Sequence, residues 1–180
     1  MDAWAPIHVA AANNDPDALA RALAAGAAPD LKESGTPSSF PRTPLLLVLE
    51  HMHSSSEARA ARCVAHLLDA GASVTEINGE GRLPLHLAAR GFPSIVALLV
   101  RAGADVNART GWDRGHQASL NSADEFAEIE GSLTPLHIAA LSGDHWRCAI
   151  ILLAAGAQVE SKCAYLTNAT SPLDIAIFYG

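Results

Sequence analysis

Several features that would point to particular classes of protein are missing from this 180-residue sequence. Its 12 lysines and arginines are scattered among 19 acidic residues, giving a net charge of −7, whereas non-specific nucleic-acid binding needs clustered basic side chains. No stretch approaches the roughly 20 apolar residues that a membrane-spanning helix needs. The N-terminal stretch MDAWAPIHVAAANND lacks the basic flank and long apolar run of a signal peptide. We therefore expect an intracellular protein, in the cytoplasm or the nucleus, that neither binds nucleic acid nor inserts into a membrane.

Cysteine is scarce, and metal-binding patterns are weak. The sequence has three cysteines, which cannot all pair with one another: Cys63, Cys148 and Cys163. The first two fall within apolar helical patterns, where a reduced cysteine behaves as a small core residue. His51 and His53 form an HxH pair beside His66, but a zinc site needs about four ligands and no acid or thiol cluster is near. An exposed loop is a simpler interpretation of this pair than a metal site, and we expect no metal or cofactor.

Motifs that indicate catalysis are missing as well. The sequence has no G-x-S-x-G nucleophile elbow and no phosphate-binding P-loop. Apolar residues make up 49% of the chain and charged residues only 17%, which is too apolar for a disordered chain and sufficient for one folded domain. We therefore expect a folded protein that has no catalytic residues and is not an enzyme.

The sequence does contain an internal repeat built from two segments. The first segment recurs as APIHVAAANND from Ala5, TPLLLVLEH from Thr43, LPLHLAARG from Leu83, TPLHIAALSG from Thr134 and SPLDIAIFYG from Ser171. The second follows as LAAGAAPD from Leu23, LLDAGASV from Leu67, LVRAGADVNA from Leu99 and LLAAGAQVE from Leu152. A T-P-L-H-x-A signature with a period of about 33 residues marks the ankyrin repeat. Over nearly its whole length the chain resembles the ankyrin-repeat family, which implies an all-α solenoid that binds other proteins.

Local signals predict the same helices without the resemblance. Thr43 and Thr134 are suited to cap a helix, and the proline after each fits its first turn. Asp15 and Pro16 make the same start signal. A glycine follows each apolar segment of the second type, where a left-handed closing residue is expected: Gly26, Gly71, Gly103 and Gly156. Each unit exposes apolar faces that only stacking can cover, so the array should form one elongated domain.

The spacing of the repeats predicts a single domain over residues 1–180. Four full repeats lie at about 3–35, 40–77, 78–108 and 131–164, with a partial repeat at 168–180. The proline of the first segment recurs at intervals of 38, 40, 51 and 37 residues, so the connections carry insertions, the longest at about 109–132. Extra residues within the second repeat lie around 51–56. The last repeat stops after its first helix, either because the chain is a fragment of a longer protein, which we favour, or because this half-repeat is a cap.

A histidine stands at the same place in three repeats, as His8, His86 and His137. A catalytic or metal-binding histidine would not need to recur at the repeat period. The resemblance implies instead that these side chains tie adjacent loops together through hydrogen bonds. Leu46 and Asp174 replace the histidine in the second and fifth repeats, which leaves the loop contacts there open.

Asn107 lies in the segment LVRAGADVNA, with Leu99 eight residues before it and Asp105 two before it. This arrangement resembles the sites that an asparaginyl hydroxylase modifies in ankyrin proteins, so Asn107 is a candidate for hydroxylation. The alternative, which we prefer, is that this asparagine orders its own loop.

The insertion at about 109–132 is the most distinctive segment, and loops of this length are usually functional or disordered. Ser122 to Glu125 has the pattern of a capping box at the start of an acidic helix, DEFAEIE. Trp112 and Phe126 are aromatic anchors that either contact a partner or pack locally. A binding role, local packing and disorder all remain open, and we favour binding.

In the family that the chain resembles, partners are bound by the hairpin tips and by the end of each first helix. The hairpin positions are Trp4, Arg42, Arg82, Leu133 and Thr170. The helix-end positions are Asn13, His51, Arg90, Ser142 and Tyr179, with Glu50, Leu141 and Phe178 beside them. We predict that Arg42, Arg82 and Arg90 form a basic patch for an acidic or carboxylate-bearing segment. The alternative is that these arginines are solvated and paired with Glu50 and Glu80.

The sequence thus predicts a monomeric, all-α ankyrin-repeat solenoid that serves as a protein-binding scaffold or adaptor. Its mechanism would be rigid presentation of a preformed surface. One alternative is an inhibitor that occludes the surface of a single enzyme. Another is the N-terminal fragment of a larger protein, such as a ubiquitin-ligase substrate receptor, an ion channel or a multidomain enzyme.

Overall fold

Regular structure in the chain is helical, as predicted. The computed structural model describes residues 5–33, 42–53, 56–110, 133–142, 146–163 and 171–179. Over these ranges the chain forms nine helices, none of which has the length and apolar character needed to cross a lipid bilayer. The helices are α1 (Pro6–Ala12), α2 (Pro16–Ala24), α3 (Pro44–Glu50), α4 (Glu57–Asp69), α5 (Pro84–Ala88), α6 (Pro93–Arg101), α7 (Pro135–Leu141), α8 (Trp146–Ala154) and α9 (Pro172–Tyr179).

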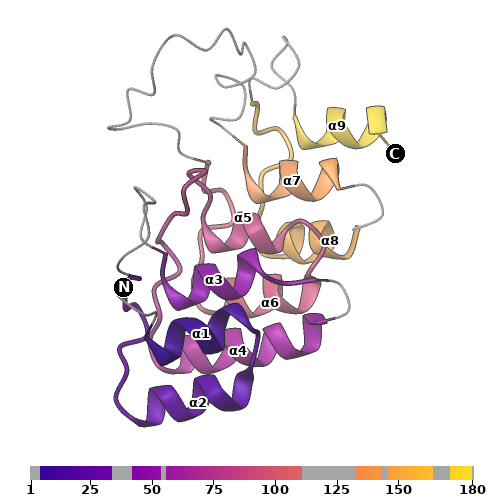
Figure 1. Ribbon diagram of the computed structural model, residues 1–180. Helices are drawn as coiled ribbons and strands as arrows, with labels where there is room; N and C mark the ends of the chain where they lie inside the picture. Colours follow the sequence, from indigo (N-terminus) through magenta and orange to yellow (C-terminus); the bar gives the residue numbers. More distant parts are fainter. Residues whose placement is uncertain are drawn as a thin grey trace, which may run out of the picture.

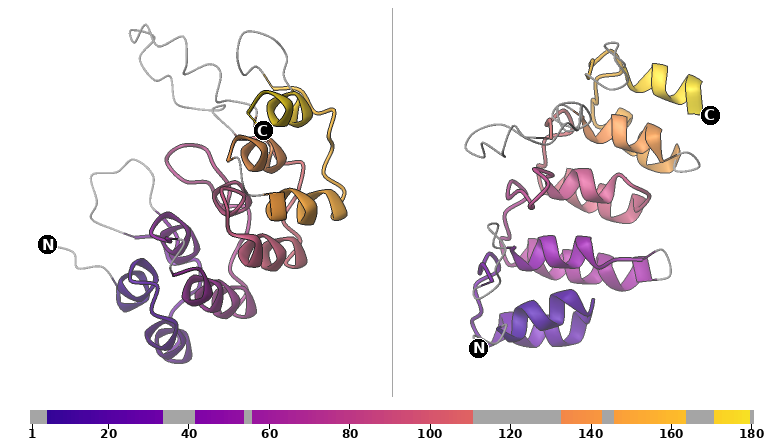
Figure 2. Two further views of the ribbon diagram at one scale, coloured as in Figure 1. Left: turned by 90° about the vertical axis from the view of Figure 1, so that its right-hand side faces the viewer. Right: turned by 45° about the horizontal axis from the view of Figure 1, so that its top comes forward.

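The helices stack in two parallel rows (Figure 1). The first helices of the units, α1, α3, α5, α7 and α9, pack on one another in sequence, and the second helices, α2, α4, α6 and α8, form the other row. In each of the first four units, the two helices also pack against each other. Figure 2 shows the units following one another from the N-terminus to the C-terminus. The architecture is the predicted all-α repeat solenoid.

Helix boundaries follow the predicted start and stop signals. The Asp15 side chain caps α2, with its Oδ1 accepting hydrogen bonds from the backbone N–H groups of Asp17 and Ala18 at 3.1 and 3.0 Å. Each second helix is followed by a glycine with φ between 86° and 91°, at Gly26, Gly71, Gly103 and Gly156. A side chain at this left-handed φ would be strained, and the conformation lets the next N–H bond back to the helix, as Ala27 does to the Ala22 carbonyl at 3.1 Å.

One apolar core runs between the two rows. Helix α3 contributes most densely, because all five residues from Leu45 to Leu49 are at most 4% exposed. Ala88, Ala89 and Ala139 are buried where neighbouring first helices pack. Small side chains at these positions allow a close approach of the two backbones.

Two of the three recurring histidines, His8 and His86, tie loops together, as the resemblance implied. His8 Nε2 lies 2.7 Å from the Leu31 carbonyl. His86 Nε2 lies 3.1 Å from the carbonyls of both Ala108 and Leu133, while its Nδ1 accepts a hydrogen bond from Leu83 N–H. Burial lowers the pKa of His86 to about 4, so the ring is neutral near pH 7 and carries its proton on Nε2.

Asp174, which replaces the histidine in the last repeat, keeps part of its role. Its Oδ2 accepts hydrogen bonds from Ser171 N–H and Ser171 Oγ–H at 2.9 and 2.8 Å, and Asp174 N–H donates to Ser171 Oγ. The bonds from Ser171 lower the pKa of Asp174. An ionised carboxylate has no proton to donate to a loop carbonyl, so it reproduces the helix cap but not the link between loops. Leu46, in the second repeat, is simply buried in the core.

The two longest departures from the repeat pattern are accommodated differently. Helix α4 has 13 residues, whereas α2, α6 and α8 have 9 each, so part of the extra length of the second repeat extends this helix. The long insertion starts and ends at a closed point, because Thr110 N–H donates to the Leu133 carbonyl at 2.8 Å and Leu133 N–H donates to Thr110 Oγ1 at 3.0 Å. The predicted helix beginning at Ser122 and the aromatic residues Trp112 and Phe126 lie outside the described residues.

A candidate protein-binding groove beside α3 and α5

A groove of about 470 Å³ lies where the ends of α3 and α5 meet the turn formed by residues 78–82. It brings together the hairpin residue Arg42 and the helix-end residue Arg90, which are far apart in the sequence but were both predicted to meet a partner. Glu50, beside the helix-end positions, also faces the groove. The lining residues are Arg42, Glu50, Asn78, Gly79, Glu80, Leu87 and Arg90.

Arg42 is held on one side of the groove by two carboxylates. Its Nε and Nη2 donate to the two oxygens of Glu33, at 2.6 and 3.3 Å, and its Nη1 donates to Glu50 Oε2 at 3.3 Å. The Glu33 side chain is fully buried, and the bond to it is the main reason why the pKa of Arg42 is raised. Glu33 is the important residue that sequence reasoning missed. The signal available was its place at the hairpin opposite Arg42, where Glu33 N–H donates to the Arg42 carbonyl.

Glu50 and Asn78 join the groove across neighbouring repeats. Asn78 Nδ2 donates to Glu50 Oε1 at 3.1 Å. Asn78 Oδ1 accepts hydrogen bonds from the backbone N–H groups of Glu80 and Arg82, both at 3.0 Å, and thereby shapes the turn. One chain of polar contacts therefore runs from Glu33 to this turn and gives the groove a fixed wall.

The charge of the groove is mixed rather than uniformly basic. Arg42 pairs with Glu33 and Glu50, and Arg82 pairs with Glu80 at 2.8 Å. The sequence left two interpretations open, a basic patch or arginines paired with Glu50 and Glu80. The ion pairs of Arg42 and Arg82 agree with the second interpretation. Arg90 differs, because it is exposed just after α5 and forms no ion pair with any residue in the described ranges.

The remaining predicted contact residues are placed less uniformly. Leu133 is only 5% exposed and packs in the core, so it does not lie on the surface where we expected it, because its backbone closes the insertion against Thr110. Leu141 and Ser142 are half-buried, and Ser142 Oγ donates to the Ile138 carbonyl within its own turn. Neither residue lines the groove: Leu141 is the last residue of α7, and Ser142 follows it.

His51 and Asn13 are exposed at the ends of their first helices, as expected. Among the residues that the structure describes, no group of three or more histidine, cysteine, aspartate or glutamate side chains is arranged to hold a metal ion. Trp4 and Thr170 lie outside the described ranges. Phe178 and Tyr179 end α9, but their side chains are also outside the description.

Asn107 joins its own hairpin to the next one. Its Nδ2 donates to the Gly156 carbonyl at 3.2 Å, its Oδ1 accepts from Gln158 N–H at 2.8 Å, and its own N–H donates to Asp105 Oδ1. These contacts support the loop-ordering role. A hydroxylase acting on this side chain would first have to break both bonds to the next repeat, so hydroxylation remains a prediction.

Stacked helix pairs with glycine-closed second helices define a repeat solenoid, and comparison with known families agrees with the geometry. Residues 7–110 match a family model described as ankyrin repeats in three copies, and residues 132–164 match the model of an ankyrin repeat. No curated protein was found to match the chain. The chain belongs to the ankyrin-repeat family. Ankyrin repeats are generally protein-interaction modules, and proteins built from them are typically non-catalytic.

Proposed function

We propose that this chain is a scaffold or adaptor that holds a segment of a partner protein in the groove beside α3 and α5. The observation that carries the proposal is the wall of polar contacts from Glu33 through Arg42 and Glu50 to Asn78. Because these side chains are already bonded to one another, little conformational freedom remains to be lost when a partner binds. The groove is therefore suited to rigid presentation.

The lining of the groove favours a partner segment that carries an acidic side chain. Of the two arginines that line the groove, Arg90 is the one that forms no ion pair in the described ranges, so it is the group best placed to receive a carboxylate. Leu87 also lines the groove but is only 3% exposed, so it contributes to the floor and little to contact with a partner. Arg42 is already neutralised by two carboxylates and contributes shape more than net charge.

A charge reversal at Arg90 tests this proposal. Arg90 is exposed, so Arg90→Glu should leave the fold intact while it repels an acidic segment. Arg101→Glu is the matched control, because Arg101 is also exposed and is the last residue of α6, in the other row of helices. Proteins captured from the native cell by the intact chain should be lost with Arg90→Glu and retained with Arg101→Glu.

A site-specific photocrosslinker strengthens the same experiment. Placed at position 90, it should attach covalently to the captured partner, and at position 101 it should not. For a purified partner, we expect Arg90→Glu to weaken binding about tenfold, corresponding to about 1.4 kcal/mol. Equal capture and equal crosslinking at the two positions would show that the groove is not the binding surface.

A further inference from the structure

The contacts between neighbouring hairpins are not the same along the array. A hairpin follows each second helix, and it begins at the glycine that has a left-handed φ. In the right-hand view of Figure 2, the hairpins lie along one side of the stack. Positions counted from that glycine are equivalent in the four hairpins, so the polar contacts at each junction can be compared position by position.

Two polar contacts join the hairpins that follow α2 and α4. The carboxylate of Asp30, four residues after Gly26, accepts hydrogen bonds from Ser73 N–H at 2.9 and 3.1 Å. Lys32, six residues after the same glycine, forms an ion pair with Glu76 at 2.9 Å. The side chains four and six residues after the glycine therefore reach forward to the next hairpin.

The hairpins that follow α6 and α8 are joined from the same two positions. Asn107, four residues after its glycine, forms two hydrogen bonds with the backbone of the next hairpin. Arg109, six residues after the glycine, donates to the Lys162 carbonyl at 2.9 Å and to Ser161 Oγ at 3.1 Å. This junction thus repeats the pattern seen between the first two hairpins.

The junction between the hairpins that follow α4 and α6 lacks both contacts. Thr75 and Ile77 occupy the two positions. Thr75 Oγ1 lies 2.9 Å from Ser73 Oγ within its own turn, and Ile77 is 47% exposed. No hydrogen bond or ion pair joins residues 70–77 to residues 102–108, all of which the structure describes. The hairpins are therefore joined as two pairs, with an unjoined edge between the pairs.

The side chain at position 75, and not the backbone, explains the missing contact. Thr75 N–H donates to Ser73 Oγ at 3.2 Å, and in the same way Asn107 N–H donates to Asp105 Oδ1 at 2.9 Å. The two turns therefore hold their fourth residue in a similar local conformation. Threonine lacks the terminal amide with which Asn107 reaches the next hairpin.

The backbone on the other side of this junction is also left without its usual contact. At the two joined junctions, the N–H two residues after the glycine donates to a side chain of the preceding hairpin, at Ser73 and at Gln158. Its counterpart, Asp105 N–H, has no acceptor among the described residues. Asp105 is exposed, so water can satisfy this donor.

The helical side of the same junction is held together. Helices α4 and α6 pack against each other. Glu57 Oε1, in the first turn of α4, also accepts a hydrogen bond from Ser94 N–H, in the first turn of α6, at 3.1 Å. These contacts lie at the N-terminal ends of the two helices, whereas the hairpins follow their C-terminal ends. The junction is therefore fastened at one end and open at the other.

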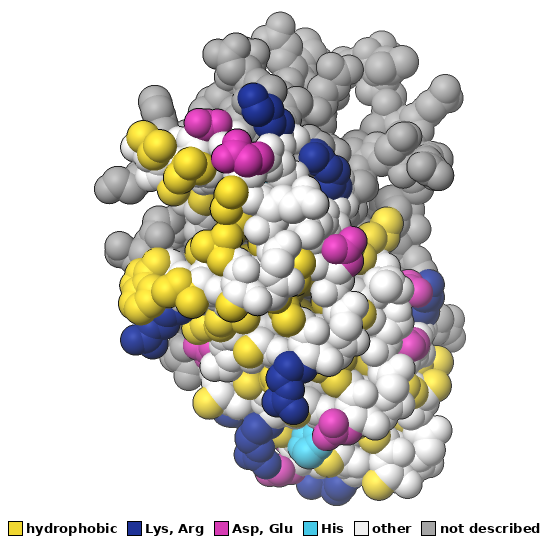
Figure 3. Space-filling model, turned by 180° about the vertical axis from the view of Figure 1, so that it is seen from behind, with side chains coloured by type: hydrophobic (Ala, Val, Ile, Leu, Met, Phe, Trp, Pro, Cys, Tyr) yellow, Lys and Arg dark blue, Asp and Glu magenta, His cyan; other side chains and the backbone are white. Residues whose placement is uncertain are grey.

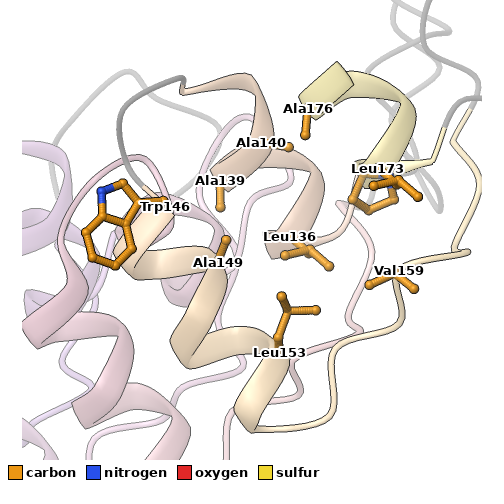
Figure 4. A pocket seen from close by; sticks show the side chains of 10 residues that line it. Leu136, Ala139, Ala140, Trp146, Ala149, Leu153, Val159, Leu173 and Ala176 are labelled. Carbon is orange, nitrogen blue, oxygen red and sulfur yellow. The ribbon is translucent and has the colours of Figure 1, made fainter. Parts of the chain in front are cut away.

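Each repeat should move as one body, because apolar side chains join its two helices. Figure 4 shows this in the fourth repeat, where Leu136 of α7 and Leu153 of α8 point toward each other. On the face of the molecule in Figure 3, basic and acidic side chains are interspersed, so no field of one sign forces the repeats apart. The hairpin contacts are the local feature that distinguishes this junction.

We propose that the junction between the second and third repeats is the hinge of the array, where the hairpin edge opens while α4 and α6 act as the pivot. The groove lies across this junction, since Arg42 and Glu50 belong to the second repeat and Leu87 and Arg90 to the third. Opening the hinge changes the distance from Arg90 to the wall of polar contacts, and so selects which partner segments fit. This consequence rests on the proposed function, whereas the hinge itself does not.

Amide hydrogen exchange measured by NMR tests the missing contact. In the parent chain, the protection factor of Asp105 N–H should be about tenfold lower than those of Ser73 and Gln158, which is the effect of about one hydrogen bond. Thr75→Asn introduces the residue found at position 107 and should raise the protection of Asp105 about tenfold. Thr75→Ala is the matched control and should leave it unchanged.

Pulsed EPR distance measurements test the motion. An exposed alanine precedes the glycine of each hairpin and offers equivalent labelling sites, at Ala70, Ala102 and Ala155. Nitroxides attached to a non-natural amino acid at these sites leave the cysteines unmodified. The 70–102 distance distribution should be broader than the 102–155 distribution, and Thr75→Asn should narrow it. Asn107→Thr makes the converse change and should broaden the 102–155 distribution.

Three results would overturn the hinge. Equal protection of Asp105 and Ser73 in the parent chain would show that another contact joins the hairpins. Equal widths for the two label pairs would show that the missing contacts permit no motion. Equal widths in Thr75→Asn and Thr75→Ala would show that position 75 does not control the junction. Circular dichroism checks that each variant keeps its helices, and if Thr75→Asn does not fold, Asn107→Thr decides alone. No partner is needed and Arg90 is unchanged throughout, so the hinge and the proposed function can fail separately.

Discussion

Acidification should destabilise the array through His86, and the structure gives both the sign and the size of the effect. In the folded chain, burial lowers the pKa of His86 to about 4. The hydrogen bonds to the Leu133 and Ala108 carbonyls raise this pKa and so offset part of the effect of burial. In the unfolded chain it titrates near the ordinary value of about 6.5. At a pH between these two pKa values, His86 is protonated in the unfolded chain and neutral in the folded chain. The stabilising contribution is therefore complete above about pH 6.5 and is lost as the pH falls toward 4.

The magnitude follows from the two pKa values. Lowering the pH from 7 to 5 should remove about 2 kcal/mol of folding free energy through this one residue. Solvent screening reduces the effect little, because the His86 side chain is fully buried. Other groups also titrate over this range, so the quantity to measure is the difference between the parent chain and a variant that has no group titrating at position 86.

Urea unfolding at pH 7 and pH 5 measures this difference. His86→Gln should lower the free energy of unfolding by about 1–3 kcal/mol at pH 7, because buried partners lose their hydrogen bonds. Its further loss on going to pH 5 should be about 2 kcal/mol smaller than that of the parent chain. His53→Gln, at an exposed residue, serves as the control and should behave like the parent chain. If His86→Gln and the parent chain lose equal free energy over this pH range, the buried, neutral state of His86 is wrong.

Three further predictions concern residues that hold the array together. Arg42→Met should lower the free energy of unfolding by about 3 kcal/mol, because it leaves the buried Glu33 carboxylate without its ion pair; chemical denaturation checks this, and a loss below about 0.5 kcal/mol would contradict it. Asn107→Ala removes two bonds to the next repeat and should cost about 1–2 kcal/mol, with faster amide hydrogen exchange in α8; unchanged exchange there would argue against the bridging role. Burial raises the pKa of the Cys63 thiol to about 11, so a thiol reagent at pH 8 should label this residue only on unfolding, and rapid labelling of folded protein would refute its burial.

Much of the fold could be predicted because the residues at the helix ends are chosen by local conformational preferences. Proline at the first position of a helix and glycine after its last turn act within a few residues, so they are visible in the sequence. The length of α4 was harder to predict. No comparable signal in the sequence shows which of the extra residues of the second repeat extend this helix.

The candidate site could be predicted only in part, because its chemistry depends on contacts between distant segments. The family pattern placed Arg42 and Arg90 on one surface, and the groove contains both. The charge balance could not be derived from the pattern, since it depends on Glu33, which meets Arg42 across a hairpin. Leu133 occupies a hairpin position by spacing alone, but its backbone pairs with Thr110, and this carries its side chain into the core.

The closed junction at Thr110 and Leu133 makes the solenoid tolerant of foreign sequence at that point. His86 is hydrogen-bonded to the carbonyls of Ala108 and Leu133, one on each side of the junction. The two ends of the insertion are therefore held together independently of the sequence that connects them. The entropy of closing a loop grows only with the logarithm of its length, at about 0.6 kcal/mol per doubling. A fluorescent protein or an affinity tag inserted between Thr110 and Leu133 should therefore leave the helix stack intact. This position is suitable for labelling the protein in cells.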